Sequence, residues 1–145
     1  MHEIVAERLW IGTTGEAHDL SDLLEREIAA LVDLAAEELS PKLTREIIYC
    51  RFPLVDGPGN SRGLICCAVE TVAGLLRKEI PTLVSCSAGM SRSPCVVAAA
   101  MAGLQKEDPD EHLRRVTAQH PHDITPALWE EIKQACSGLD LPSQA

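Results

Sequence analysis

Strand-like and helix-like stretches alternate along this chain, and the alternation restricts its fold more than any other feature of the sequence. Runs rich in β-branched and other apolar residues predict strands over 4–11, 28–34, 47–55 and 82–85. Amphipathic or continuously apolar stretches predict helices over 16–27, 61–78, 95–104, 110–119 and 126–136. Such alternation is typical of an α/β layer structure with a largely parallel sheet. We therefore expect an α/β fold.

The length and composition fit one domain. The 145 residues include 46% apolar residues, which is enough for a single packed core. We expect this domain to span residues 1–137. A flexible tail is expected over 138–145, because the last predicted helix has ended there.

The charge balance argues against two classes of partner. The chain has 13 Lys and Arg and 22 Asp and Glu, so its formal net charge is −9 at pH 7. Such a chain is not attracted broadly to nucleic acid or to an anionic membrane, so any anionic ligand must be held locally. No apolar run approaches the roughly 20 residues of a membrane-spanning helix, and the N-terminus lacks the pattern of a signal peptide. A cytoplasmic location is therefore expected.

The six cysteines predict neither disulfide bonds nor a zinc site. A chain with a core of this size does not need disulfide bonds, so reduced thiols are expected. The only close pair, Cys66 and Cys67, is adjacent in sequence, whereas zinc ligands are separated by about two to four residues. No metal and no cofactor are expected.

One short segment combines a nucleophile with an anion-binding geometry. A predicted strand delivers Cys86 into a loop, and Arg92 follows after five residues, where a helix begins. Loop amides that curl towards a helix N-terminus form a nest for an anion, and the helix dipole adds partial positive charge. Gly89 allows a positive φ, and the guanidinium of Arg92 can grip two oxygens of a tetrahedral anion. The expected phosphate-binding residues are Ser87, Ala88, Gly89, Met90, Ser91 and Arg92.

The same nest favours the thiolate form of Cys86, which is the nucleophilic form. A thiolate beneath a bound phosphate predicts in-line attack on phosphorus and a phosphocysteine intermediate. Asp56, in a Gly- and Pro-rich loop after a predicted strand, is the candidate proton donor to the leaving group and the candidate base for water in the second step. Ser93 is the candidate that hydrogen-bonds the departing thiolate.

The run 86–93 resembles the Cys-x5-Arg-Ser/Thr signature of the cysteine-dependent protein tyrosine phosphatases, and its Ala-Gly-x-Ser-Arg-Ser part resembles the dual-specificity branch. Segment 8–12 resembles an early strand motif of that branch, and 121–128 resembles the segment before its last helix. Asp56 stands where the general acid of the branch would stand. The resemblance covers roughly residues 8–135.

The resemblance implies a four- or five-stranded, mainly parallel sheet flanked by helices, and chemistry without a metal. It also implies hydrolysis of phosphomonoesters on Tyr and often on Ser or Thr. The expected substrate is a phosphorylated protein or a small phosphomonoester, with phosphate or a similar oxyanion in the pocket. The family usually has His directly before the nucleophile, whereas this chain has Ser85. A hydroxyl brings no charge, so we expect a slower enzyme or one with a higher pH optimum.

Other functions stay open from the sequence. A phosphate-binding module or pseudophosphatase would keep the pocket without turnover. A phosphatase of the same fold could act on a non-protein substrate. A sulfur- or arsenate-handling enzyme also uses a Cys, a short nest and an Arg, although the five-residue spacing, the Ser that follows and the upstream acid disfavour it.

Several residues also have a purely structural interpretation. Cys86 could be a buried thiol at the end of a strand, Asp56 a turn residue before Gly, and Ser93 the N-cap of a helix. The adjacent acids Glu37 and Glu38 are interpreted as residues that solvate the surface.

Overall fold

Five strands form one sheet in the computed structural model of the protein, which describes residues 1–142. The spatial order is β1-β2-β5-β3-β4. The bounds are β1 His2–Val5, β2 Leu9–Thr13, β3 Ala30–Ala35, β4 Ile48–Leu54 and β5 Thr82–Cys86. β1 pairs antiparallel with β2, and the other neighbouring pairs are parallel. The predicted largely parallel sheet is confirmed, and β5, which ends at Cys86, lies at its centre.

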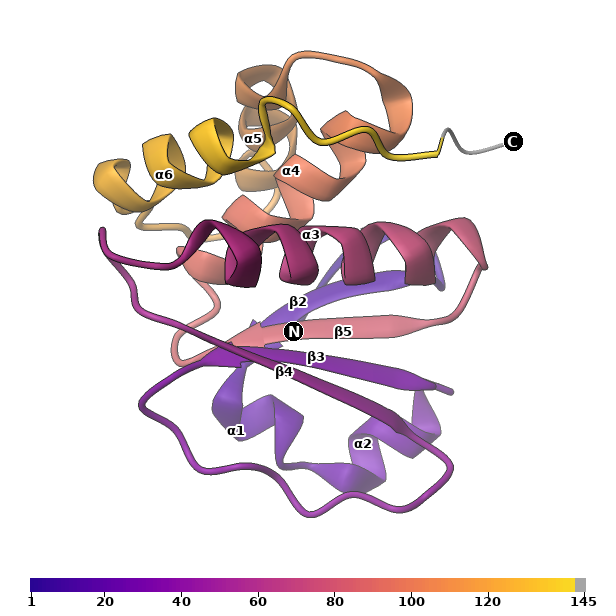
Figure 1. The fold of residues 1–145 in the computed structure, drawn as a ribbon. Coiled ribbons are helices and arrows are strands. Elements are labelled where there is room, and N and C mark those ends of the chain that lie inside the picture. The colour runs from indigo at the N-terminus through magenta and orange to yellow at the C-terminus, as the bar shows by residue number, and fades with distance from the viewer. Residues whose placement is uncertain (143–145) are drawn as a thin grey trace.

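Helices cover both faces of the sheet (Figure 1). The bounds are α1 Thr14–Ala17, α2 Leu20–Glu25, α3 Arg62–Arg77, α4 Arg92–Gln105, α5 Pro109–Thr117 and α6 Pro126–Cys136. α1 and α2 lie on one face, and α3 and α4 lie on the other, with α5 and α6 packed on them. This layered arrangement confirms the predicted α/β class.

The two helices next to the sheet follow from their sequences. Ser61 is the N-cap of α3, because its side chain accepts a hydrogen bond from the backbone N of Leu64 at 3.2 Å. α3 buries one apolar side against the sheet. α4 is buried almost throughout and carries Pro94 in its first turn, where a backbone N–H is not needed. The main hydrophobic core lies between these helices and the sheet.

The single helix expected over 16–27 is wrong, because the structure has the two short helices α1 and α2 there. Asp19 interrupts the helix with non-helical backbone angles (φ −87°, ψ 81°), and its side chain accepts from the backbone N of Asp22. Such local side-chain bonds compete with helix propagation. Thr13 is the N-cap of α1 and forms a capping box with Glu16.

The chain after α6 packs back onto the molecule. Leu141 is buried in the main core, and its carbonyl oxygen accepts a hydrogen bond from Lys106 Nζ at 2.5 Å. Of the residues 138–145 for which a flexible tail is expected, 143–145 lie outside the described residues. Within 1–142, no helix combines the length and the apolar character needed to cross a membrane.

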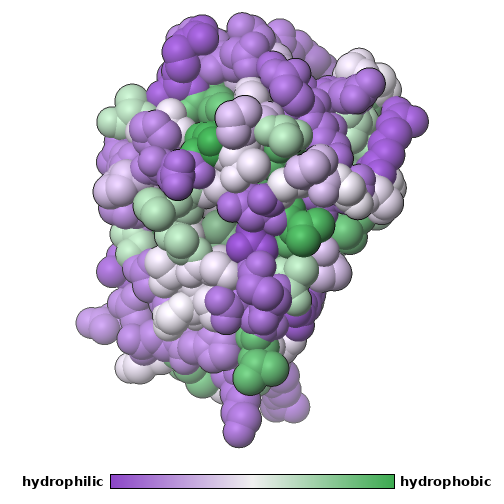
Figure 2. Space-filling view, turned by 90° about the vertical axis from the view of Figure 1, so that its left-hand side faces the viewer, coloured by the Kyte–Doolittle hydropathy of each residue, from purple (hydrophilic) through white to green (hydrophobic). Residues whose placement is uncertain are grey.

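Parallel pairing brings the carboxyl ends of β3, β4 and β5 to one end of the sheet, on the left in Figure 1. The loops that follow these strands meet there, as is usual for sites in α/β sheets. Figure 2 looks onto this end, where hydrophilic residues surround smaller apolar areas. The candidate site is therefore expected between these three loops.

Candidate active site

The loop between Cys86 and Arg92 is held tightly against β2. Gly89 has a φ of 68°, in the left-handed region that favours glycine. A Cβ atom placed on Gly89 would lie 2.9 Å from the carbonyl oxygen of Gly12 on β2. Both the backbone angle and the close approach therefore require glycine at this position.

Three carbonyl oxygens of this loop bind partners outside it. Thr14 donates from its backbone N to the Ser87 oxygen and from Oγ1 to the Cys86 oxygen, both at 3.4 Å. The Met90 oxygen accepts from the backbone N of Asp123 at 2.9 Å. When the carbonyl groups of a loop point outwards, its amide groups can point inwards and form a nest for an anion.

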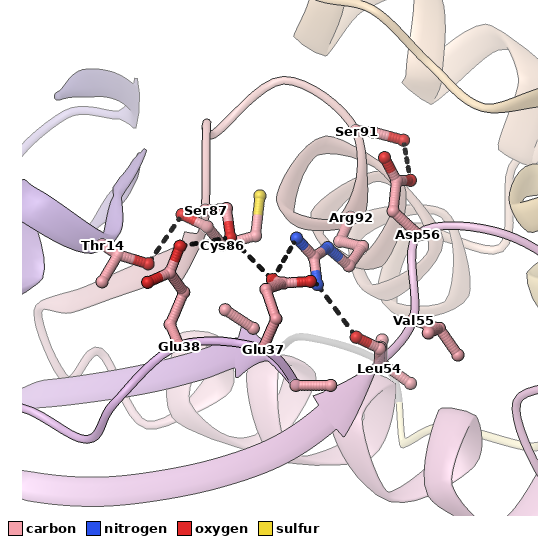
Figure 3. Close-up of polar contacts among 12 residues, drawn as sticks. Thr14, Glu37, Glu38, Leu54, Val55, Asp56, Cys86, Ser87, Ser91 and Arg92 are labelled. Atoms are coloured by element: carbon pink, nitrogen blue, oxygen red, sulfur yellow. Dashed lines mark hydrogen bonds and ion pairs between the residues drawn. The ribbon is translucent and has the colours of Figure 1, made fainter.

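One cavity of about 170 Å³ brings together the candidate nucleophile Cys86, the candidate anion-binding residue Arg92 and the candidate acid Asp56. Cys86 and Arg92 are buried, whereas Asp56 is exposed. Figure 3 shows the loop passing from Cys86 to Arg92, with Asp56 beyond the guanidinium. The cavity is lined by Asp56, Cys86, Ser87, Ala88, Met90, Ser91, Arg92 and Asp123.

Arg92 is only 5% exposed, and its position is fixed by two partners. Nη1 donates to Glu37 Oε2 at 3.1 Å and to the backbone oxygen of Leu54 at 2.9 Å. Nη2 lies 2.7 Å from Glu37 Oε1. A guanidinium has five N–H groups. Within residues 1–142, Nε and the second hydrogen of Nη2 have no partner, and this side of the fork can take two oxygens of an anion.

Glu37 and Glu38 do not merely solvate the surface, so that interpretation is corrected. Ser87 Oγ lies 2.6 Å from Glu37 Oε1 and 2.8 Å from Glu38 Oε1, so its single hydrogen is shared between two carboxylates (Figure 3). The hydrogen bonds from Arg92 hold the pKa of Glu37 below its ordinary value. The acids come near the loop because β3, which precedes them, ends at the same edge as β5.

The electrostatics of Arg92 combine opposing effects. Burial acts to lower the pKa of Arg92, because it removes water from a charged group. The hydrogen bonds to Glu37 and the negative charges of Cys86 and Asp56 act in the other direction, and the net result is a raised pKa. Arg92 is therefore charged at neutral pH.

Asp56 is tied to the loop through one hydroxyl group. Ser91 Oγ donates to Asp56 Oδ1 at 2.7 Å and accepts from the backbone N of Thr125 at 3.0 Å. Ser91 is buried, and it joins three segments that are far apart in sequence. Asn60 closes the loop that carries Asp56, because its side chain bonds both the N and the O of Val55. Oδ2 of Asp56 has no hydrogen-bond partner among the described residues.

Two buried hydroxyls, one directly before Cys86 and one directly after Arg92 in sequence, lack partners among the described residues. Ser93 and Ser85 are 0% and 1% exposed, and neither Oγ has a hydrogen-bond partner among the residues that the structure describes. Ser93 is not the N-cap of α4, because that helix begins at Arg92 and its N-cap is Ser91. The Ser93 hydroxyl is therefore free to act elsewhere.

Sequence reasoning missed Glu37 and Asp123 as site residues. A sequence signal for Glu37 exists and is the same as for Asp56. Both acids follow strands whose carboxyl ends meet at one edge of the sheet. Asp123 carries no such signal, because it precedes a helix and reaches the cavity only through packing. No group of three or more His, Cys, Asp or Glu side chains within 1–142 could hold a metal ion.

No protein-family profile and no curated protein matches the sequence. Solved structures do match. DUSP15 is 22% identical, with a TM-score of 0.78 over 92% of this chain and 85% of that chain. Human DUSP28 is 19% identical, with a TM-score of 0.78 over 96% of this chain and 97% of that chain. The human tyrosine phosphatase-like serine/threonine/tyrosine-interacting protein is 19% identical, with a TM-score of 0.79 over 94% and 95%. The chain therefore has the dual-specificity phosphatase fold, which confirms the fold that the resemblance implied.

Proposed function

We propose that this chain, which has the dual-specificity phosphatase fold, is a cysteine-dependent phosphomonoesterase. More narrowly, it is a dual-specificity protein phosphatase that works through a phosphocysteine intermediate. The observation that carries the proposal is the single cavity lined by Cys86, Arg92 and Asp56. A thiol, a guanidinium and a carboxylate supply the nucleophile, the anion clamp and the proton donor that phosphoryl transfer from an ester needs.

The phosphate of the substrate binds within the loop 87–91. Backbone amides of the loop and the N-terminus of α4 stabilise its negative charge. Arg92 adds its Nε and Nη2 N–H groups, which Glu37 and Leu54 leave free, and these bind two phosphate oxygens. This binding holds the phosphorus next to Sγ of Cys86.

In the first step, the Cys86 thiolate attacks phosphorus, a P–S bond forms and the P–O bond of the ester breaks. The leaving oxygen takes a proton from Asp56. Because Ser91 binds Oδ1 of this carboxylate, Oδ2 is the oxygen available to carry the proton. The products are phosphocysteine and an alcohol or phenol.

In the second step, a water molecule attacks phosphorus, and Asp56, now ionised, takes a proton from it. The P–S bond breaks, phosphate leaves and the thiolate returns. The unpartnered Oγ of Ser93 donates a hydrogen bond to this thiolate as the P–S bond breaks. No step uses a metal ion, so EDTA should leave the rate unchanged.

The test is hydrolysis of an aryl phosphate and of a phosphotyrosine peptide by the purified chain and three variants. Cys86→Ser and Arg92→Met should reduce turnover to background. Asp56→Asn should reduce kcat on the peptide about 100-fold, because general acid catalysis contributes that much for a poor leaving group. Rapid acid quench should trap phosphate on Cys86. Equal turnover by the wild-type chain and Cys86→Ser would refute the proposal.

Chemical modification provides a second measurement. Burial raises the pKa of the Cys136 thiol to about 11, so this thiol is protonated at pH 7. Iodoacetamide should therefore modify Cys86 before Cys136, and inorganic phosphate should protect Cys86 alone. Unprotected or unselective labelling would argue against an anion site at Cys86.

A second candidate is a phosphate-binding protein without turnover. The observation that favours it is Ser85, whose Oγ is buried without a partner where the family resemblance expects a His. This candidate predicts that vanadate and phosphate bind, while no phosphomonoester is hydrolysed at any pH. Turnover by the wild-type chain separates the two candidates, because only an enzyme hydrolyses the aryl phosphate.

A further inference from the structure

The cavity presents a second carboxylate that the proposed chemistry does not use. Asp123 lines it together with Asp56. The backbone N of Asp123 donates to the Met90 oxygen, so this residue is fixed to the phosphate-binding loop. Its side chain is exposed and makes no hydrogen bond or ion pair within residues 1–142. The charge of Asp123 is therefore free to act on a bound molecule.

Positive charge around the cavity is scarce and already engaged. Among the described residues, Arg92 is the only cationic side chain that lines the cavity, and it is paired with Glu37. Arg51 is near the same edge, but its guanidinium binds the backbone oxygens of Ala35, Ala36 and Glu38 and the side chain of Ser40. Around the cavity and its loop, the carboxylates of Glu37, Glu38, Asp56 and Asp123 therefore outnumber the guanidinium groups of Arg51 and Arg92.

The site nevertheless points to an anionic ligand. Arg92 is nine-tenths buried, lines the cavity and keeps N–H groups without a partner within 1–142. A phosphate bound there is attracted locally by Arg92 and the loop. The carboxylates around the cavity repel any further negative charge. A positive group next to the phosphate is attracted by the same carboxylates.

We propose that Asp123 selects phosphomonoesters that carry a positive charge beside the phosphate. The substrate class is a phosphopeptide with Arg or Lys next to the phosphorylated residue. The inference rests on the proposed function, because it assumes that the phosphate of a substrate enters the cavity. A molecule with several phosphates, such as a phosphoinositide, brings further negative charge to the rim and is disfavoured.

The test compares two phosphotyrosine peptides that differ only at the residues beside the phosphotyrosine, Arg in one and Glu in the other. The wild-type chain should show kcat/KM about tenfold higher for the Arg peptide at low salt. In 0.5 M NaCl the ratio should fall towards one, because salt screens exposed charges. Phosphoinositide vesicles should be hydrolysed more slowly than either peptide.

Asp123→Asn gives the sharper result. This variant should lower kcat/KM for the Arg peptide and raise it for the Glu peptide, because an attraction and a repulsion are removed together. A general structural defect would lower both values. Glu25→Gln, which changes an exposed carboxylate on α2 outside the cavity, is the matched control and should leave the ratio unchanged.

Binding keeps this proposal separate from catalysis. Fluorescence anisotropy of the same peptides on Cys86→Ser should show tighter binding of the Arg peptide, even if no substrate is turned over. Turnover without a charge preference overturns the inference and leaves the proposed function intact. A charge preference in binding without turnover overturns the proposed function and leaves the inference intact. Equal affinities for both peptides, or changes of the same sign in Asp123→Asn, overturn the inference.

Discussion

Arg92 is a buried cation, and its ability to bind an anion depends on one neighbouring carboxylate. Glu37 binds the end of its guanidinium, and the Leu54 oxygen binds one further hydrogen, so only one side of the fork is left for a ligand. We expect Glu37→Gln to reduce kcat/KM for an aryl phosphate about tenfold, mainly through KM, because losing a charge-assisted bond loosens the clamp. Steady-state kinetics measure this. Glu38→Gln is the control, since Glu38 contacts Ser87 but not Arg92.

The same ion pair predicts a dependence of stability on pH. The pKa of Glu37 is lower in the folded protein because Arg92 hydrogen-bonds its charged form. The ion pair therefore contributes to the free energy of unfolding. This contribution is fully present above the pKa of Glu37 in the unfolded chain, about 4.3, and is lost as the pH falls through the lower pKa in the folded protein. The wild-type chain should therefore be more stable than Glu37→Gln at pH 7, and the difference in urea midpoint should shrink below about pH 4. A constant difference would show that the pair does not titrate.

Ser91 binds one oxygen of Asp56, and in the proposed mechanism this leaves the other oxygen for the leaving group. Ser91→Ala should lower kcat about tenfold on a phosphotyrosine peptide, whose leaving group needs a proton. The effect on p-nitrophenyl phosphate should be far smaller, because that leaving group departs readily as an anion. Ser91→Thr should restore the peptide rate, since the hydroxyl is retained. Equal losses on both substrates would instead indicate damage to the phosphate-binding loop.

The site also shows which residues sequence can identify. Cys86 and Arg92 lie in one loop, so their spacing is readable directly from the chain. Glu37 is 55 residues from Arg92, and a pair of exposed acids is typical of a solvated surface. Its contact depends on the order of strands in the sheet, which no local pattern records.

Among the connecting elements, the loop from β5 to α4 contains a position that requires glycine. Gly89→Ala should lower the free energy of unfolding by about 1–3 kcal/mol, because the new Cβ meets the Gly12 carbonyl and the residue has a positive φ. Phosphate binding should weaken with it. Gly74→Ala is the control, since Gly74 lies in α3 with nothing within 4 Å of the added Cβ. That change should stabilise the helix by roughly 0.5–1 kcal/mol. Urea unfolding and phosphate titration measure both variants.

The predicted elements are confirmed where independent sequence signals agree. The helix expected over 126–136 is observed as Pro126–Cys136, because one apolar face and a leading Pro agree. The helix expected over 16–27 fails at Asp19, where a side chain that caps one helix ends the other. Apolar spacing alone cannot separate a continuous helix from two short ones.

At the scale of the whole molecule, the chain beyond α6 contributes to the core. Leu141 is buried, and its Cδ1 would lie 2.5 Å from a Cβ placed on Gly103 of α4. Leu141→Ala should lower the free energy of unfolding by about 2 kcal/mol. A chain cut after residue 137, the domain boundary expected from the sequence, should lose at least as much. Thermal unfolding of both proteins checks this, and an unchanged Tm would show that residue 137 is a sufficient boundary.

The hydroxyl of Ser91 binds the acid loop on one side and the start of α6 on the other. Thr125 contributes only its backbone N to this contact, yet the position of Asp56 depends on it through Ser91. A redesign of α6 that moves Thr125 would move Asp56 as well, and with it the proton transfer proposed for this carboxyl group.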